Sequence, residues 1–430
     1  KYNKFMPHPI KFGTKEETIP GKEGEKEEKV TIDNIINNPN PAWTKPPADL
    51  KDEDYKQFYR ELYPYQFEEP LFHIHLNVDY PFNLTGILYF PKISNDLNLQ
   101  KDRIQLYQNQ VFVTDNVEGI VPEFLGLLKG VIDSPDIPLN VSRSYLQSDA
   151  SVKKITNYIT RKVADKLNSI FKNERENLES KWNDIKVVIE YGMLTEDKFY
   201  DKAESFNLYP TVDDKYFTYE ELEKKIKKLQ TDKDGNLIIL YAQNKDEQYT
   251  YIESAKEKGY EVLLLDSPII PHLMQKLESK KEKVKFSRVD SDTLENLIKK
   301  DEEVISKLTD EEKEKLKPMI ETAVENEKYT VQLEALDSNS MPFMLAQPEF
   351  MRRMKEMQQT GGGAMGNLPD MYSLIVNTNH ELVGKILNTR TEKKRNSLIK
   401  QSIDLAKLSQ NNLTGKDLTE FINRSIDLIK

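Results

Sequence analysis

The sequence predicts a mixed α/β and α+β fold in three regions. We expect a large α/β region over residues 1–180, a smaller βαβ region over 181–305 and an α+β region over 306–430. Two patterns support this: strand-like runs alternate with helical periodicity in the first region, and the second holds strand, helix and strand in about thirty residues. A chain of 430 residues is also too long to fold around a single hydrophobic core.

In the first region, β-branched and aromatic residues predict neighbouring strands at Leu71–Val78 and Leu84–Phe90 and another at Gln105–Asp115. Apolar residues at helical spacing predict a long helix over Val152–Glu179. Lys15–Lys29 is almost all Lys, Glu and Gly and has no residues with which to bury a face, so we expect a polar loop there.

The second region predicts a strand at 237–241, a helix at 249–258 and a strand at 262–265, a parallel pair with a right-handed crossover. It lacks a Gly-rich phosphate loop, which argues against a nucleotide site here. A charged helix at 301–317 marks the boundary of the third region, which ends in two amphipathic helices at 393–408 and 416–429.

The composition excludes several classes of protein. A net charge of −10 argues against binding to nucleic acid or to an anionic membrane. The absence of Cys removes disulfides and thiolate chemistry, and no stretch is apolar for long enough to span a membrane. We therefore expect a cytoplasmic protein, and the first residue, Lys1, indicates a fragment of a longer chain.

One segment resembles a known family. The runs Leu106–Asp115, Ile120–Leu125 and Lys129–Arg143 closely resemble the middle-domain signature of the heat-shock protein 90 family. Ala42–Lys45 and Pro70–Lys92 are similar to its tryptophan loop and central hairpin. The chain has no acidic C-terminal peptide, which points to the bacterial HtpG type. The resemblance implies a two-part middle domain and a C-terminal dimerisation domain, without the N-terminal nucleotide-binding domain.

The resemblance assigns catalytic roles to Arg143 and Gln147. In the family, the matching arginine reaches the ATP held by the N-terminal domain, and a guanidinium suits recognition of the γ-phosphate. Ser144 stands where most members carry Glu. Without the family, Arg143 beside Asp133 and Asp136 is a structural ion pair. ATP and Mg²⁺ are expected only in the full-length protein, and this chain alone is expected to be inactive.

A methionine-rich segment is the candidate surface for unfolded client proteins. Its residues are Met341, Phe343, Met344, Leu345, Phe350, Met351, Met354 and Met357. Unbranched, polarisable methionines adapt to varied partners, although a stripe of this kind is more often a core-facing helix. Trp43 is either a further client contact, as in the family, or a cover for the edge of a core.

The last two helices carry wide apolar stripes and, by the resemblance, form half of a four-helix interface with a second copy. The candidate interface residues are Leu398, Ile403, Leu418, Phe421, Ile422, Ile426 and Ile429. Packing within one chain is the alternative. His73 and His75 share a strand face with no third ligand indicated, so we expect no metal site.

Three functional hypotheses follow. The first is the middle and C-terminal part of an ATP-dependent chaperone, with unfolded clients, a second copy and its own N-terminal ATPase domain as partners. The second is an ATP-independent client-binding module or scaffold that shares the fold. The third, an autonomous enzyme built on the βαβ region, lacks any catalytic constellation in the sequence.

Overall fold

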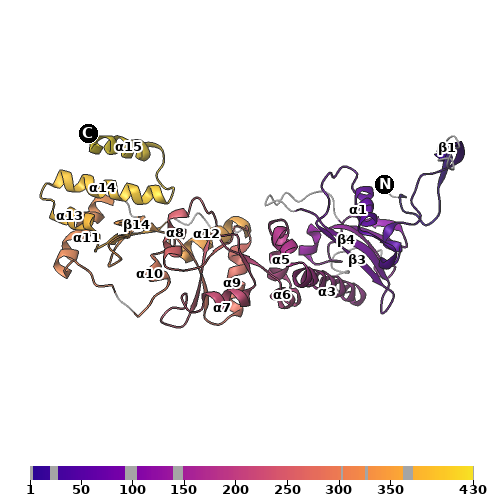
Figure 1. The fold of residues 1–430 in the computed structure, drawn as a ribbon, viewed down its shortest axis with the longest axis horizontal. Coiled ribbons are helices and arrows are strands. Elements are labelled where there is room, and N and C mark those ends of the chain that lie inside the picture. The colour runs from indigo at the N-terminus through magenta and orange to yellow at the C-terminus, as the bar shows by residue number, and fades with distance from the viewer. Residues whose placement is uncertain are drawn as a thin grey trace. The chain divides into compact units, whose positions relative to one another are not determined.

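The computed structural model describes residues 3–19, 28–92, 104–138, 149–301, 304–324, 328–361 and 371–429. Its internal contacts divide the chain into two units, Lys1–Asn207 and Leu208–Lys430. Each unit combines sheets and helices (Figure 1), which confirms the predicted α/β and α+β class. The three regions with boundaries at 180 and 305 stay a prediction.

The first unit is built on a five-stranded mixed sheet in the order β3-β4-β7-β5-β6. Its strands are β3 (Phe72–Val78), β4 (Leu84–Phe90), β5 (Gln105–Gln108), β6 (Val111–Thr114) and β7 (Lys129–Asp133). β5 and β7 are parallel and the other neighbours antiparallel. The pair β3–β4 is as predicted. The single strand predicted over 105–115 is wrong, because Asn109 and Gln110 turn at φ 49° and 66° and make a hairpin.

The first unit also contains helices. They are α1 (Asp52–Leu62), α3 (Ala150–Asn173), α4 (Arg175–Ser180), α5 (Trp182–Thr195) and α6 (Asp197–Ala203), with short 3₁₀ turns η1 (Ala42–Thr44), η2 (Pro47–Asp49) and η3 (Glu123–Leu127). α1 and η1 share a core with β4, β5 and β7, while α3 packs against β3. Asp149 caps α3 by accepting hydrogen bonds from the amides of Ser151 and Val152. The predicted helix over 152–179 is interrupted at Glu174, whose φ is −143°.

A separate antiparallel hairpin joins β1 (Lys11–Ile19) and β2 (Glu28–Ile35). The prediction of a polar loop over 15–29 is therefore wrong where the structure describes this segment. Both faces of the hairpin are largely exposed, so its strands need no apolar alternation. Ion pairs connect the two strands instead, such as Lys11–Asp33 at 2.6 Å.

The second unit begins with a parallel sheet in the order β11-β10-β12. The elements of this part of the unit are β8 (Tyr209–Pro210), β9 (Tyr216–Phe217), α7 (Tyr219–Ile226), β10 (Leu237–Ala242), α8 (Tyr249–Glu257), β11 (Val262–Leu264), α9 (Ile270–Lys280), β12 (Val284–Arg288) and α10 (Leu294–Leu297). Of these, β8 and β9 pair in a separate two-stranded sheet. The predicted βαβ unit is confirmed as β10-α8-β11. Every residue of β10 is buried, which explains its uninterrupted apolar sequence.

A second sheet of this unit has the order β13-β15-β14. The elements of this second part are α11 (Asp310–Val324), β13 (Tyr329–Glu334), β14 (Phe343–Ala346), α12 (Glu349–Gly361), β15 (Tyr372–Asn377), α13 (Glu381–Asn388), α14 (Glu392–Ser409) and α15 (Gly415–Ile429). α11, α13 and α14 bury apolar residues against the sheet. The last two helices lie where predicted, whereas the helix expected at 301–317 begins only at Asp310.

Candidate functional site

The predicted catalytic residues, Arg143 and Gln147, lie outside the described residues. Asp133 and Asp136, the carboxylates of the alternative ion pair with Arg143, have partners among the described residues. Asp133 accepts hydrogen bonds from Trp43 Nε1 at 3.1 Å and from the Gln110 amide at 2.8 Å. Asp136 accepts one from the Asn83 amide at 2.7 Å. Each carboxylate thus joins the end of β7, or the turn after it, to segments far away in the sequence.

Trp43 lies inside the first unit. Its side chain is 0% exposed and packs edge-on against Phe5 and tilted against Phe58 and Tyr107. Its indole donates to Asp133, which satisfies both polar groups inside the core. This geometry favours the interpretation of Trp43 as a residue that covers a core. A fully buried side chain offers no surface to a client.

The methionine-rich segment falls on β14, on the turns before it and on α12. Phe343 and Leu345 are buried and hold β14 in its core, so these two predicted client residues face inward. Met341 is 45% exposed and Phe350 70% exposed. Met344, Met351, Met354 and Met357 are partly exposed. The accessible part of the segment is therefore Met341, Met344 and one face of α12.

α12 turns its charged stripe, rather than its apolar one, toward the protein. Glu349, Arg352, Arg353 and Glu356 follow the spacing i, i+3, i+4, i+7 and so share one face. Arg352 is only 3% exposed. Phe350, Met351 and Met354 point away from this face, while Met357, four residues after Arg353, lies at its edge. This arrangement reverses that of an ordinary core-facing amphipathic helix.

A polar cluster holds that charged stripe against β10, β12 and α9. The Tyr241 hydroxyl donates to Glu349 at 2.7 Å and accepts a hydrogen bond from Arg352. Arg353 binds both carboxylate oxygens of Glu278, at 2.8 and 3.2 Å, and donates to the Phe286 carbonyl at 2.5 Å. Such bidentate, charge-assisted contacts fix both position and orientation.

The electrostatics of this cluster centre on Glu349. Burial alone would raise the pKa of its carboxyl, but the guanidinium groups of Arg352 and Arg353 outweigh burial and hold the pKa at about 2. Burial, reinforced by the charge of Glu349, raises the pKa of Tyr241. At neutral pH, Glu349 is therefore ionised and Tyr241 protonated, as their hydrogen bonds require.

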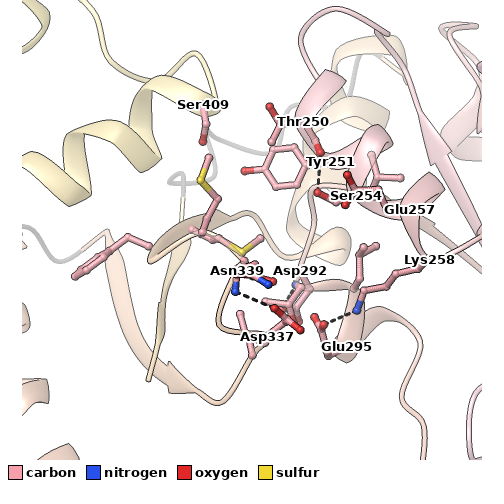
Figure 2. A pocket seen from close by; sticks show the side chains of 18 residues that line it. Thr250, Tyr251, Ser254, Glu257, Lys258, Asp292, Glu295, Asp337, Asn339 and Ser409 are labelled. Carbon is pink, nitrogen blue, oxygen red and sulfur yellow. Dashed lines mark hydrogen bonds and ion pairs between the residues drawn. The ribbon is translucent and has the colours of Figure 1, made fainter. Parts of the chain in front are cut away.

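A cavity of about 540 Å³ opens beside Met341 and Met344. Its walls come from α8, from the loop between β12 and α10 and from the loop between β13 and β14, with Ser409 at the end of α14 (Figure 2). No single stretch of sequence contains these elements, so the cavity could not be predicted from a local motif.

The predicted dimer residues divide between core and surface. Ile403 is 4% exposed and Phe421 9% exposed, while Leu398 packs partly buried against the core. Leu418 is half-buried, and Ile422 and Ile426 are each 47% exposed. The side chain of Ile429 lies outside the described residues.

Two leucines of α14 are also exposed. Leu405 and Leu408 of α14 are 47% and 40% exposed. α15 is tied to α14 through polar side chains: Gln401 donates to Ser425 at 2.8 Å, and Arg424 pairs with Asp404. These polar contacts join the two helices, while Leu405, Leu408, Ile422 and Ile426 stay exposed.

The two histidines of β3 do not belong to a metal site in the part of the chain that the structure describes. No group of three or more His, Asp or Glu side chains there is arranged to hold a metal ion. His75 accepts or donates a hydrogen bond with the Tyr55 hydroxyl at 2.9 Å, and the Tyr55 ring stacks on His73. No helix in the described ranges is both long and apolar enough to cross a membrane.

Comparison with known proteins identifies the family. The family described as Hsp90 protein matches residues 10–424. This chain belongs to the heat-shock protein 90 family. It is 47% identical to the chaperone protein HtpG of Bacteroides thetaiotaomicron over 498 aligned residues, covering 100% of this chain and 72% of that protein.

Other HtpG proteins agree with this family assignment. Identity to HtpG of Porphyromonas gingivalis is 53% over 413 residues, covering 95% of this chain and 60% of that protein. Identity to HtpG of Halalkalibacterium halodurans is 32% over 304 residues, covering 68% of this chain and 47% of that protein. The chain is thus an HtpG-type heat-shock protein 90 chaperone sequence that matches only part of these relatives' length, and the predicted resemblance is confirmed.

Proposed function

We propose that this chain is the client-binding and dimerising part of an ATP-dependent chaperone. One observation carries the client-binding proposal: α12 is anchored by its charged stripe and leaves Phe350 70% exposed beside Met351 and Met354, which are partly exposed. An outward apolar face on an anchored helix has no use in packing the chain's own core. It is suited to apolar segments that unfolded proteins expose.

Methionine lets this face bind apolar groups of different shapes. Its unbranched side chain has three rotatable bonds and a polarisable sulfur, so Met351, Met354 and Met357 can repack around apolar groups of different shapes. Phe350 supplies a rigid aromatic anchor beside them. A surface of this kind binds many sequences weakly rather than one sequence tightly.

Client binding is tested by the aggregation of a chemically unfolded protein diluted into buffer with or without this chain. We expect the chain to slow aggregation at equimolar ratio. Unchanged aggregation, with the chain shown to be folded by circular dichroism, would remove the client-binding proposal.

Dimerisation is supported by the uncovered residues of α14 and α15. Leu405, Leu408, Ile422 and Ile426 are exposed apolar side chains of these two helices, which a second copy would cover. Sedimentation equilibrium at tens of micromolar should give twice the chain's mass. A monomer at that concentration would contradict dimerisation.

The ATPase role rests on the family and on Arg143 and Gln147. In the longer protein, an N-terminal domain would hold ATP and Mg²⁺, and the Arg143 guanidinium would stabilise charge on the transferring phosphoryl group. We expect negligible ATP turnover by this chain alone. In the longer protein, Arg143→Ala should lower kcat by ten-fold or more, about 1.4 kcal/mol, while ATP affinity barely changes.

The second candidate is an ATP-independent client-binding module. It shares the α12 surface, so only the ATPase measurement separates the two. If Arg143→Ala leaves turnover unchanged in the longer protein, Arg143 is structural and this second candidate is favoured. The cytoplasmic location stays a prediction in either case.

A further inference from the structure

The cavity beside Met341 and Met344 has an apolar interior. Its apolar lining includes Tyr251, Val289, Leu294, Leu336 and Phe343. With a volume of about 540 Å³ it lies within the range of pockets that take small ligands or several amino-acid side chains. Met341 is 45% exposed at its edge and can adjust to the shape of an occupant.

The same cavity carries an excess of negative charge. Four carboxylates line it, those of Glu257, Asp292, Glu295 and Asp337, against one ammonium group, that of Lys258. Lys258 is already paired with Glu295 at 2.5 Å, as Figure 2 shows. The other three carboxylates face no cation in the part of the chain that the structure describes.

The partners of those three carboxylates are neutral where they exist. Asp292 accepts from the Thr293 amide at 2.7 Å and the Asn296 side chain at 3.0 Å, and Asp337 accepts from the Asn339 amide at 2.8 Å. Carboxylates that lack a cation in the chain itself attract one from a ligand.

We propose that this cavity binds client segments in which an apolar side chain is flanked by lysine or arginine. The apolar side chain enters the cavity, and the flanking cations meet Glu257, Asp292 and Asp337. Segments with flanking Asp or Glu are rejected by like charge. This proposal rests on the proposed client binding and adds a sequence preference to it.

The test uses two fluorescein-labelled nonapeptides, one with Leu between lysines and one with Leu between glutamates, in anisotropy titrations with the whole chain. We expect the lysine peptide to bind at least ten-fold more tightly. The double variant Glu257→Gln with Asp337→Asn should weaken its binding about ten-fold and should weaken the salt dependence. Both positions are exposed, so the fold tolerates the change.

The matched control is Asp234→Asn with Glu314→Gln, which removes the same charge from exposed positions outside the cavity. This variant should bind both peptides as the wild type does. Equal binding of the two peptides, or equal effects of the two double variants, would overturn the proposal.

Aggregation assays on the same proteins separate this inference from the proposed function. If the chain slows aggregation but does not discriminate between the peptides, the charge preference is wrong and client binding stands. If it discriminates between the peptides but never slows aggregation, the cavity is a peptide site and the chaperone role of this chain fails.

Discussion

Phe350→Ser tests whether α12 is the client surface. Full burial of a phenylalanine side chain contributes about 1.5–3 kcal/mol. Since 70% of Phe350 remains to be covered, we expect its loss to cost about 1–2 kcal/mol of client binding, roughly a five- to thirty-fold rise in Kd. The substitution removes little that packs within the chain, so the free energy of unfolding should change by less than about 0.5 kcal/mol.

The assay is anisotropy of a labelled, permanently unfolded protein titrated with the chain. Phe12→Ser is the matched control, because Phe12 is 74% exposed on β1 in the other unit. The control should bind as the wild type does. An unchanged Kd for Phe350→Ser, or an equal loss with Phe12→Ser, would refute the assignment of α12 as the specific surface.

Four further outcomes follow from the structure. Ile422→Ser with Ile426→Ser should weaken the dimer by at least about 2 kcal/mol, more than twenty-fold in sedimentation equilibrium; an unaltered dimer would place the interface elsewhere. Tyr241→Phe should lower the free energy of unfolding by about 1–3 kcal/mol and speed amide hydrogen exchange in α12; unaltered exchange would mean that the polar cluster does not anchor the helix. Trp43→Phe, which leaves the buried Asp133 carboxylate short of a donor, should destabilise the first unit by about 2–3 kcal/mol in urea without weakening client binding; weaker binding at unchanged stability would restore the client-contact interpretation. Burial, more than any neighbouring charge, lowers the pKa of His73 from 6.5 to about 4. Between pH 6.5 and about 4 the folded state therefore binds fewer protons than the unfolded state, so the free energy of unfolding should fall as the pH drops through this range. His73→Gln should make the free energy of unfolding depend less on pH in this range; the same pH dependence in the variant would assign it to other groups.

These urea experiments have a natural probe. Trp43 and Trp182 are the two tryptophans of the sequence, and both are fully buried in the first unit. Their fluorescence therefore reports unfolding of that unit. Changes made in α12 or α15 should leave this transition in place.

Elements with strong local signals could be predicted from the sequence. The apolar runs at 237–241 and 262–265 became β10 and β11, and the periodic segments near the C-terminus became α14 and α15. Weak local signals failed. The turn at Asn109 and Gln110 contains no glycine, and the charged strands of the β1–β2 hairpin bury no face, so neither resembled a strand pairing in the sequence.

The site could be predicted in composition but not in orientation. The spacing of methionines in α12 indicated an apolar face, but whether that face points inward depends on where the charged stripe finds partners. Those partners, Tyr241, Glu278 and the Phe286 carbonyl, lie 67 to 111 positions earlier in the chain. The burial of Trp43 likewise depends on Asp133, 90 positions away.

The most direct test of the account is photo-crosslinking from position 350. A photoreactive phenylalanine analogue would replace Phe350 in one sample and Phe12 in another, each mixed with an unfolded protein and, separately, with the same protein in its native state. We expect strong crosslinks from position 350 to the unfolded protein alone, and few from position 12. Equal crosslinking from both positions, or none from position 350, would contradict the claim that α12 presents its apolar face to unfolded clients.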